Sequence, residues 1–410
     1  MLNLPFLKIA SRRDLVEYDK NIVALDIGTE QLKSVLFSVN ELGVDIKKIS
    51  RVEQQQHAMK SGIIKNLDTV LENCRLAISE LNDRLTQEEF PKSVVMGIAG
   101  EYIQGVSIVV NYQREENYEK EVTEKEERKI LTQIEKKIED SGKEDLSQRV
   151  GLTNEDIEIL HITQTGLEIG GMPVDSLVGY KGRNVKLNFY ASFAPKTYTE
   201  ALKKVAAELK MDVLGIVSQP FAVARAYAGS SNKDFSAIFV DIGGGTTDIA
   251  IVEKGNVVET KMFAFGGRAF TKEISKVLDL KYRFAEQRKI KYSERELNKE
   301  LARDVQKVVY PVAKLWMKTL SSAFTYCDDI SSFPTDIYLC GGGALLPEIK
   351  EVMLEFPWKR YLPFPVVPRI NFFTPEKLET IKDNSGDLRH ISDITPASLA
   401  KFIYDTEVKK

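Results

Sequence analysis

The chain has 410 residues, which is too long for one hydrophobic core, so two lobes or domains are expected. Hydrophobic residues make up 43% and charged residues 29% of the sequence, which is typical of a soluble globular protein, and the formal net charge of −3 argues against a nucleic-acid binder with a broad basic face. The 3 cysteines lie far apart without CxxC spacing, and no run of about 18 apolar residues occurs. We therefore expect a cytoplasmic protein without a disulfide framework, a zinc site or a membrane span.

The N-terminal segment has the composition of a membrane-surface anchor. It lacks the long apolar core and the cleavage site of a signal peptide, and Pro5 interrupts its pattern. The residues that indicate an anchor are Leu2, Leu4, Phe6, Leu7, Lys8, Ile9, Arg12 and Arg13. Two interpretations stay open: a short membrane-surface segment, or a terminal stretch that packs on its own domain.

The first part of the chain predicts a pair of strands followed by a helix and another strand. Residues 22–27 form an apolar run that ends at a glycine and a threonine, and residues 32–39 follow as the returning strand. Apolar residues at helical spacing predict a helix over 67–81, and residues 93–99 have the composition of a further strand.

A charged helix and a β-rich stretch come next. Thr123 and Glu126 form a capping box that opens an amphipathic helix with a solvated acidic face. Residues 157–193 are β-rich, and a helix over 201–209 follows them. We assign no chemistry to the charged helix, because such runs are usually solvated helix faces.

The stretch VDIGGGTTDIAIV at residues 240–252 repeats the pattern of the first strand pair. In both places an apolar strand leads to an aspartate, then to glycine and threonine, and then to a second strand. The aspartates at matching places are Asp26 and Asp241, which indicates two halves built on one plan. Between them, residues 214–228 predict a strand, a turn at Gln219 and Pro220, and a helix.

The second half is mostly helical. A helix is predicted over 267–280, and a capping box of Ser293 and Glu296 is predicted to open a long helix that Pro311 kinks or divides. A helix over 395–404 is predicted to close the domain.

Three strand ends carry glycine turns, one after Asp26, one after Asp241 and one at residues 341–343. Backbone N–H groups in such turns form a concavity that binds anions, and only glycine lets phosphate oxygens approach so closely. The two aspartates would repel bare phosphate, but they become useful with hydrated Mg²⁺ between them. The third turn has no neighbouring acid and suits a base and ribose, or an α-phosphate at a helix N-terminus.

Together these turns predict a nucleotide in a cleft between two similar lobes, in a chain without the P-loop or Rossmann fingerprints. Asp26 and Asp241 are the candidate Mg²⁺ residues, through water. The candidate nucleotide-binding residues are Asp26, Gly28, Thr29, Lys33, Asp241, Gly243, Gly244, Gly245, Thr246, Thr247, Gly341, Gly342 and Gly343.

The glycine turns and residues 219–228 resemble the phosphate, connecting and adenosine motifs of the actin, chaperone and sugar-kinase ATPase superfamily. Within it, the chain resembles the FtsA family of bacterial cell-division proteins over residues 21–404. The segments that carry the likeness are 179–183, 266–271, 285–289 and 341–347. The resemblance implies a two-lobed α/β actin-like ATPase fold with duplicated mixed-sheet domains and an inserted α+β subdomain.

The resemblance also implies a domain division. An N-terminal extension precedes two parts of a first lobe, which flank an inserted family-specific subdomain, and a second lobe carries an upper subdomain. The boundaries are 1–20 for the extension, 21–99 and 193–235 for the first lobe with its connecting helix, 100–192 for the inserted subdomain, 236–266 and 336–410 for the second lobe with the closing helix, and 267–335 for its upper subdomain.

Three further residues are assigned through the resemblance. The family's acid and lysine that match Glu286 and Lys289 hold the ribose and adenine, so both join the candidate set; the alternative is a solvated helix face. Gln219 stands where relatives place glutamate, and a neutral amide can orient a water but cannot accept its proton. We therefore expect ATP and Mg²⁺ to bind, with slow or negligible hydrolysis.

The implied function is a filament-forming protein that ties the FtsZ ring to the inner face of the cell membrane. Its expected partners are the FtsZ C-terminal tail, further copies of itself through the inserted subdomain and second lobe, and the membrane surface, but no nucleic acid. The upper subdomain would bind the FtsZ tail, and its basic stretch over 281–292 suits an acidic peptide. A basic surface that is balanced elsewhere explains the same stretch equally well.

The chain departs from the family at its end. Division actins usually continue into a C-terminal amphipathic membrane helix, whereas this sequence ends at Lys410. Either the sequence is truncated, or the N-terminal segment or a partner supplies the membrane contact. The short C-terminus favours an alternative, a PilM-like cytoplasmic component of the type IV pilus machinery. A sugar kinase would need a carboxylate base and a sugar pocket, and the sequence shows no candidate base beyond the nucleotide aspartates. A chaperone would need a further substrate domain after the core, so neither of these two classes is favoured.

Overall fold

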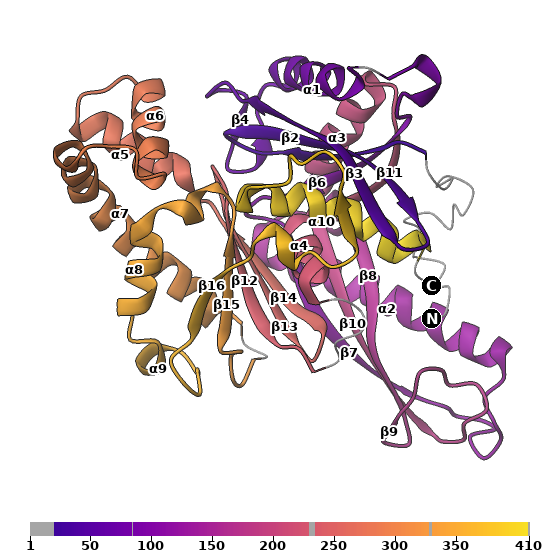
Figure 1. Ribbon diagram of the computed structural model, residues 1–410. Helices are drawn as coiled ribbons and strands as arrows, with labels where there is room; N and C mark the ends of the chain where they lie inside the picture. Colours follow the sequence, from indigo (N-terminus) through magenta and orange to yellow (C-terminus); the bar gives the residue numbers. More distant parts are fainter. Residues whose placement is uncertain (1–19, 84, 229–233, 328–329, 409–410) are drawn as a thin grey trace.

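The computed structural model describes residues 20–83, 85–228, 234–327 and 330–408 (Figure 1). The predicted N-terminal membrane-surface segment lies outside these residues, apart from Lys20. The described chain forms two lobes, each built around its own sheet, and an inserted subdomain projects below them (Figure 1). None of the helices in the described ranges is long and apolar enough to cross a membrane.

The first lobe is a six-stranded sheet with helices on both faces. Alternate residues of its central strand, β1 (Ile22–Ile27), enter different cores. Val23 and Leu25 pack with α1 (Leu67–Asn82) and α3 (Lys196–Glu208), whereas Ile22 and Ala24 pack with α4 (Gln219–Ala228) and α10 (Ile394–Ile403). The strands in spatial order are β11 (Asp212–Ser218), β6 (Ser93–Ile98), β1 (Ile22–Ile27), β2 (Gln31–Asn40), β3 (Gly43–Glu53) and β17 (Ile381–Asp383).

The second lobe repeats the central part of this plan. In the first lobe β1 pairs antiparallel with β2 and parallel with β6. In the second, β12 (Ala237–Ile242) pairs antiparallel with β13 (Thr247–Glu253) and parallel with β15 (Asp336–Cys340). Its strands in spatial order are β16 (Arg369–Phe372), β15 (Asp336–Cys340), β12 (Ala237–Ile242), β13 (Thr247–Glu253) and β14 (Asn256–Phe263). The predicted duplication of mixed-sheet domains is therefore confirmed.

The inserted subdomain continues the sheet of the second lobe. β14 meets β7 (Gln104–Gln113) through only two residue pairs, Glu259 with Val106 and Thr260 with Gly105. The sheet then continues as β7 (Gln104–Gln113), β10 (Asn184–Pro195), β8 (Ile157–Ile169) and β9 (Met172–Pro173). The predicted charged helix is α2 (Glu124–Val150); Thr123 caps it by accepting from the Glu126 N–H, and its apolar face lies on these strands.

The upper subdomain consists of α5 (Gly267–Val277), α6 (Tyr282–Ser293) and α7 (Lys299–Thr325). The predicted capping box at Ser293 and Glu296 is wrong. Asn298 caps α7 instead, because its side chain accepts from the Leu301 N–H at 2.9 Å. Arg295, with a φ of 62°, lies between α6 and α7 and keeps the two helices separate. Pro311 lies inside α7 without dividing it.

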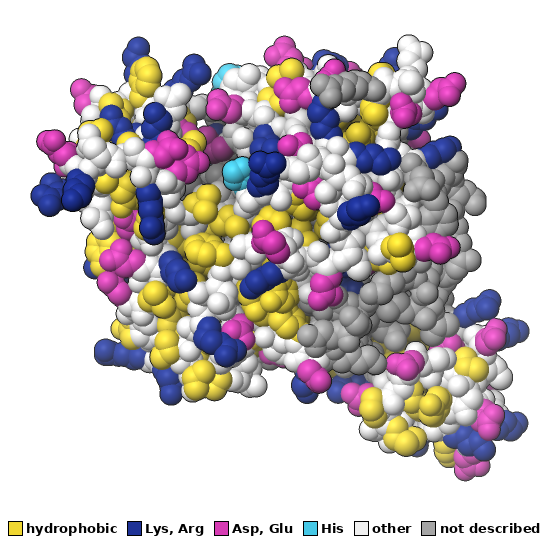
Figure 2. Space-filling model, in the orientation of Figure 1, with side chains coloured by type: hydrophobic (Ala, Val, Ile, Leu, Met, Phe, Trp, Pro, Cys, Tyr) yellow, Lys and Arg dark blue, Asp and Glu magenta, His cyan; other side chains and the backbone are white. Residues whose placement is uncertain are grey.

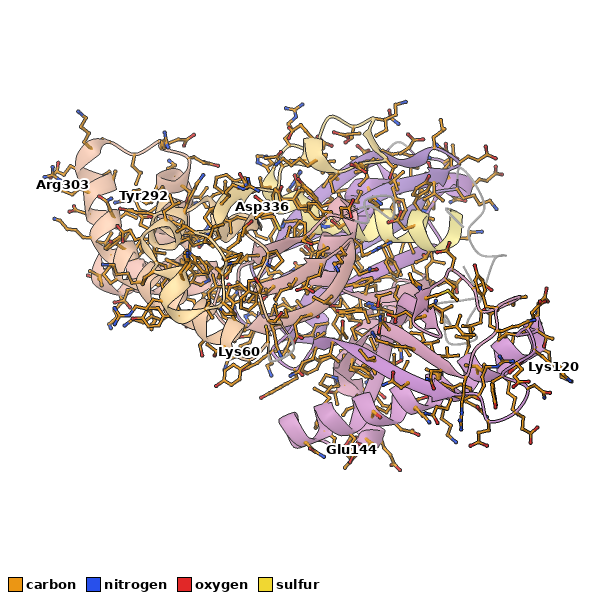
Figure 3. The ribbon with its side chains drawn as sticks, turned by 90° about the horizontal axis from the view of Figure 1, so that it is seen from below. Lys60, Lys120, Glu144, Tyr292, Arg303 and Asp336 are labelled. Atoms are coloured by element: carbon orange, nitrogen blue, oxygen red, sulfur yellow. The ribbon has the colours of Figure 1, made fainter. Side chains whose placement is uncertain are left out.

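The upper subdomain and the inserted subdomain lie at opposite ends of the molecule. Figure 3 shows Arg303 and Tyr292 at one end and Lys120 at the other.

The remaining elements are α8 (Pro347–Glu355), α9 (Trp358–Tyr361), β4 (Met59–Lys60), β5 (Ile63–Ile64), the 3-10 helices Gln87–Glu89, Asn154–Asp156, Gly342–Leu345, Pro375–Lys377 and Ile391–Asp393, and a π-helical turn at Tyr404–Val408.

The end of the chain returns to the first lobe. β17 pairs with β3, and α10 packs in the core beneath β1. The predicted boundaries otherwise remain a proposal, and we propose in addition that the segment from Ile381 onward belongs to the first lobe. The N-terminus of α10 therefore lies next to both lobes, where Ser392 accepts from Lys33 and Thr395 donates to Asp241.

Candidate functional site

The first two glycine turns face each other across the boundary between the lobes. A Cβ atom on Gly244 would lie 2.6 Å from the Glu30 Cγ, and one on Gly245 would overlap the side chain of Thr29. The Thr29 hydroxyl also accepts a hydrogen bond from the Gly62 N–H at 3.1 Å. Glycine is needed at positions 244 and 245 in this arrangement because the opposite turn packs directly against them.

Buried carboxylates stand behind both turns. Asp26 accepts a hydrogen bond from the Gln219 amide, with 2.8 Å between Nε2 and Oδ1. Asp241 accepts one from the Thr395 hydroxyl. Asp248, directly opposite Asp241 in the β12–β13 hairpin, is 3% exposed, and its Oδ1 has no hydrogen-bond partner. The site therefore concentrates negative charge from both lobes.

The electrostatics of the site favour an added cation. Burial raises the pKa of Asp26 to about 6, although Lys33 opposes that rise; Asp241 adds to it. Burial, followed by repulsion from Asp241, raises the pKa of Asp248 well above its usual value. Lys33 lies opposite Asp26 in the β1–β2 ladder and donates from Nζ to the Ser392 carbonyl at 2.6 Å.

A hydrated divalent cation would offset the burial and the repulsion that raise these pKa values, because it stabilises the charged carboxylates. No group of three or more His, Cys, Asp or Glu side chains among the described residues is arranged to hold a metal ion directly. Contact of Asp26 and Asp241 with Mg²⁺ through water fits this donor set, because Mg²⁺ keeps several of its waters.

The N-terminus of α10 contacts the site from both sides, because Lys33, opposite Asp26, donates to the Ser392 carbonyl and Thr395 donates to Asp241. Arg51 on β3 holds Asp393 through two hydrogen bonds, 2.9 Å from Nε to Oδ1 and 2.8 Å from Nη2 to Oδ2. The hydrogen bond to Asp393 raises the pKa of Arg51. Asp393 is fully buried, so this pair fixes the start of α10 and with it Thr395, which holds Asp241. A helix that packs beneath β1 thus positions a carboxylate on β12.

The third glycine turn has room for a ligand at one position. Gly341 has a φ of 80°, and a Cβ there would overlap the Asp241 carboxylate. A Cβ on Gly343 would lie 2.6 Å from the Ile242 side chain, whereas nothing lies within 4 Å of a Cβ on Gly342. Packing therefore requires glycine at positions 341 and 343, whereas Gly342 faces open space.

Glu286 and Lys289 lie next to the second turn. The Lys289 ammonium donates to the Glu286 carboxylate at 2.8 Å, to the Thr271 hydroxyl at 2.9 Å and to the Gly267 carbonyl at 3.2 Å. Lys289 is 7% exposed, so a solvated helix face does not describe it. The pair ties α6 to α5, and ribose and adenine binding by it stays a proposal.

The site residues that were not predicted from the sequence include Asp248, Thr395, Glu30, Arg268, Arg51 and Asp393. Asp248 could have been found from hairpin register, because a turn that pairs residues 242 and 247 also pairs 241 with 248. Thr395, Glu30 and Arg268 had no local signal, because each acts on a part of the chain that is distant in sequence.

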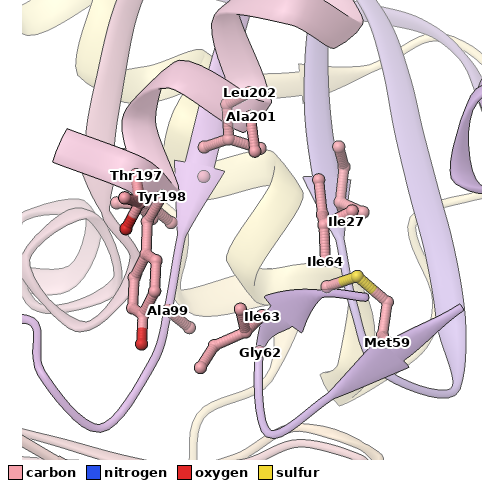
Figure 4. A pocket seen from close by; sticks show the side chains of 12 residues that line it. Ile27, Met59, Gly62, Ile63, Ile64, Ala99, Thr197, Tyr198, Ala201 and Leu202 are labelled. Carbon is pink, nitrogen blue, oxygen red and sulfur yellow. The ribbon is translucent and has the colours of Figure 1, made fainter. Parts of the chain in front are cut away.

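A small cavity lies behind the first turn (Figure 4). It measures about 40 Å³ and is lined mainly by apolar side chains from β5, the end of β6 and the start of α3, including Ile63, Ala99 and Leu202. A cavity of this size holds water-sized molecules and no nucleotide base.

The duplicated hairpins, the lobe boundary between them and the paired aspartates define an actin-like ATPase fold. A solved structure of this kind, the PilM-PilN type IV pilus biogenesis complex, matches with a TM-score of 0.66 at 13% identity, over 92% of this chain and 97% of that one. This likeness shows the fold, and it confirms the fold class predicted from the sequence.

The particular resemblance is to cell division protein FtsA, whose family model matches residues 238–378. FtsA of Pseudomonas aeruginosa is 24% identical over 282 residues, which cover 68% of this chain and 62% of that protein. FtsA of Enterococcus hirae is 24% identical over 396 residues, which cover 90% and 84%. The chain thus spans less than two thirds of the first of these relatives, and the resemblance to the FtsA family predicted from the sequence is confirmed.

Proposed function

We propose that this chain is an ATP-binding, actin-like cytoskeletal protein of bacterial cell division that assembles into filaments and links the FtsZ ring to the cytoplasmic membrane. The observation that carries the proposal is the meeting of two acidic glycine turns, one from each lobe, in a chain that resembles FtsA. A single glycine-rich turn is common in proteins and indicates no ligand, but two matching turns with buried aspartates behind them suit a nucleotide held between lobes.

In this proposal the backbone N–H groups of the two turns hold the phosphates of ATP. Asp26 and Asp241 hold Mg²⁺ through water, with Asp248 close by, and bound Mg²⁺ supplies charge neutralisation for the phosphates. The turn at residues 341–343 and the Glu286–Lys289 pair receive the base and ribose. The lobes separate for entry, because the turns touch in the present arrangement.

Hydrolysis is proposed to be slow or absent. The Gln219 amide already donates one N–H to Asp26, which leaves its second N–H and its carbonyl oxygen to orient a water. An amide cannot accept the proton of that water as a carboxylate would. Gln219 would therefore position Asp26 and a water molecule, and the protein would be at most a weak ATPase.

The proposed partners follow the family. The FtsZ tail would bind the upper subdomain, further copies would bind through the inserted subdomain and the second lobe, and the N-terminal segment would contact the inner face of the membrane. On the face in Figure 2, side chains of both charge signs are interspersed, which supports a protein without a nucleic-acid partner.

The experiment is a titration of the purified protein, in Mg-ATP, against a labelled C-terminal peptide of FtsZ from the same organism. We expect saturable binding in the micromolar range, on the order of −8 kcal/mol. A scrambled peptide of the same composition is the control. The absence of binding while ATP is bound would reject the division role.

The second candidate is a PilM-like component of the type IV pilus machinery. It is supported by the likeness in fold to the PilM-PilN complex over 92% of the chain. The same titration separates the two candidates, since a pilus component binds ATP and leaves the FtsZ peptide free.

A further inference from the structure

One second-lobe arginine reaches across the lobe boundary. Arg268, in the first turn of α5, donates from Nε to the Glu30 carboxylate. Its Nη2 donates to the Thr29 carbonyl at 2.9 Å, and its Nη1 donates to the carbonyls of Met59 at 2.9 Å and Gln56 at 3.2 Å. A single guanidinium therefore binds four first-lobe groups, all in or beside the first glycine turn and the segment that follows β3.

A second contact converges on the same carboxylate. The Tyr282 hydroxyl, from α6, donates to the Glu30 Oε1 at 2.9 Å. Only 13% of the Arg268 side chain and 21% of the Glu30 side chain are exposed. Charge-assisted hydrogen bonds at such sheltered positions are stronger than those on open surface, because water competes less for the donors and acceptors.

These contacts lie next to the first two glycine turns. The Arg268 N–H donates to the Gly244 carbonyl at 2.7 Å, and the Gly267 N–H donates to the Gly243 carbonyl at 2.9 Å. Glu30 in turn fills the space next to Gly244. Any molecule that enters between the turns must separate Glu30 from the second lobe, and the Arg268 and Tyr282 hydrogen bonds are what oppose that separation.

We propose that Arg268, Glu30 and Tyr282 form a latch between the lobes that sets how fast nucleotide enters and leaves the cleft. The nucleotide part of this inference rests on the proposed function, whereas the latch itself is a property of the protein alone. Opening breaks five hydrogen bonds that share two charged side chains. Loss of Arg268 removes four of the five and leaves the Glu30 carboxylate without its counter-charge.

The test compares the full chain with Arg268→Met and Tyr282→Phe, with Lys272→Met, an exposed residue on the same helix, as the matched control. Hydrogen–deuterium exchange without nucleotide should accelerate in peptides 54–62 and 264–272 of both latch variants and stay unchanged in the control. Release of a fluorescent ATP analogue, chased by excess ATP, should accelerate at least about tenfold in Arg268→Met, since a hydrogen bond to a charged group contributes on this scale.

A double-mutant cycle distinguishes the latch from general loosening. In the Glu30→Gln background, Tyr282→Phe should add little to the release rate, because the shared acceptor has already lost its charge. Full additivity, or exchange and release rates equal to wild type in Arg268→Met, would overturn the latch. Failure of every protein, wild type included, to bind the analogue would reject the proposed nucleotide function, and hydrogen exchange would still decide the latch.

Discussion

His161 makes the packing between the inserted subdomain and the first lobe testable through pH. It lies on β8 with its ring 3.9 Å from that of Phe221 in α4, centroid to centroid, and its Nδ1 is 2.8 Å from the Ser192 hydroxyl. Its Nε2 is buried without a partner. Burial, with a smaller contribution from Arg225, lowers the pKa of His161 from 6.5 to about 3. The folded protein therefore holds the neutral imidazole.

Because folding lowers the pKa of His161, the contribution of this residue to folding stability decreases as the pH falls. Protons bind the unfolded imidazole first, so the stability contributed by His161 is fully present above pH 6.5 and is lost as pH falls from there towards 3. At pH 5 the unfolded state gains about 2 kcal/mol from protonation, at 1.36 kcal/mol per pH unit over roughly 1.5 units. Near pH 3 the loss would reach about 5 kcal/mol, a large part of the stability of a typical domain.

The assay is urea unfolding followed by circular dichroism between pH 8 and pH 5. His161→Phe should be less stable at pH 8, because it leaves the Ser192 hydroxyl unpaired, but its free energy of unfolding should fall about 2 kcal/mol less than that of wild type by pH 5. Titrating groups common to both proteins cancel in this difference. The control His57→Phe removes an exposed imidazole and should keep the wild-type loss. Parallel curves for wild type and His161→Phe would refute the buried packing of His161 on α4.

Three further substitutions test the site. Gly244→Val should lower ATP affinity at least tenfold in an equilibrium titration while circular dichroism stays unchanged, because a side chain at this position blocks the close approach of phosphate to the turn. Unaltered affinity would contradict the assignment of that turn. Thr395→Val should cost about 1–3 kcal/mol in urea unfolding, since it leaves the buried Asp241 carboxylate without its donor, and a neutral result would show that the donor is dispensable. Gln219→Glu should raise phosphate release at pH 8 more than at pH 6, because two adjacent carboxylates, the new one and Asp26, retain a shared proton at lower pH. Phosphate release that stays at the wild-type rate at pH 8 would contradict a role for that position in activating water.

Sequence patterns were sufficient to predict a structural feature when the residues that define it lie close together in the chain. The hairpin that follows Asp26 and the one that follows Asp241 were both predicted, because alternation, glycine and a returning strand lie within about twenty residues of each other. The same hairpin register places Lys33 opposite Asp26. The long helix shows the limit of such signals: two cap candidates lie five residues apart, and the left-handed backbone of Arg295 left Asn298 as the cap.

The sequence by itself determined the two-lobed plan, the glycine turns and the aspartates beside them, because chain length and a repeated pattern indicate the lobes and short runs of residue types indicate the turns. Only the tertiary structure decided what touches those turns. Arg268 reaches Glu30 across 238 positions of the chain, and Thr395 reaches Asp241 across 154. No periodicity or spacing encodes such contacts, since they depend on how two folded sheets are placed relative to each other. The way the cleft is closed is therefore a property of the packed lobes, whereas its chemical character is already present in the sequence.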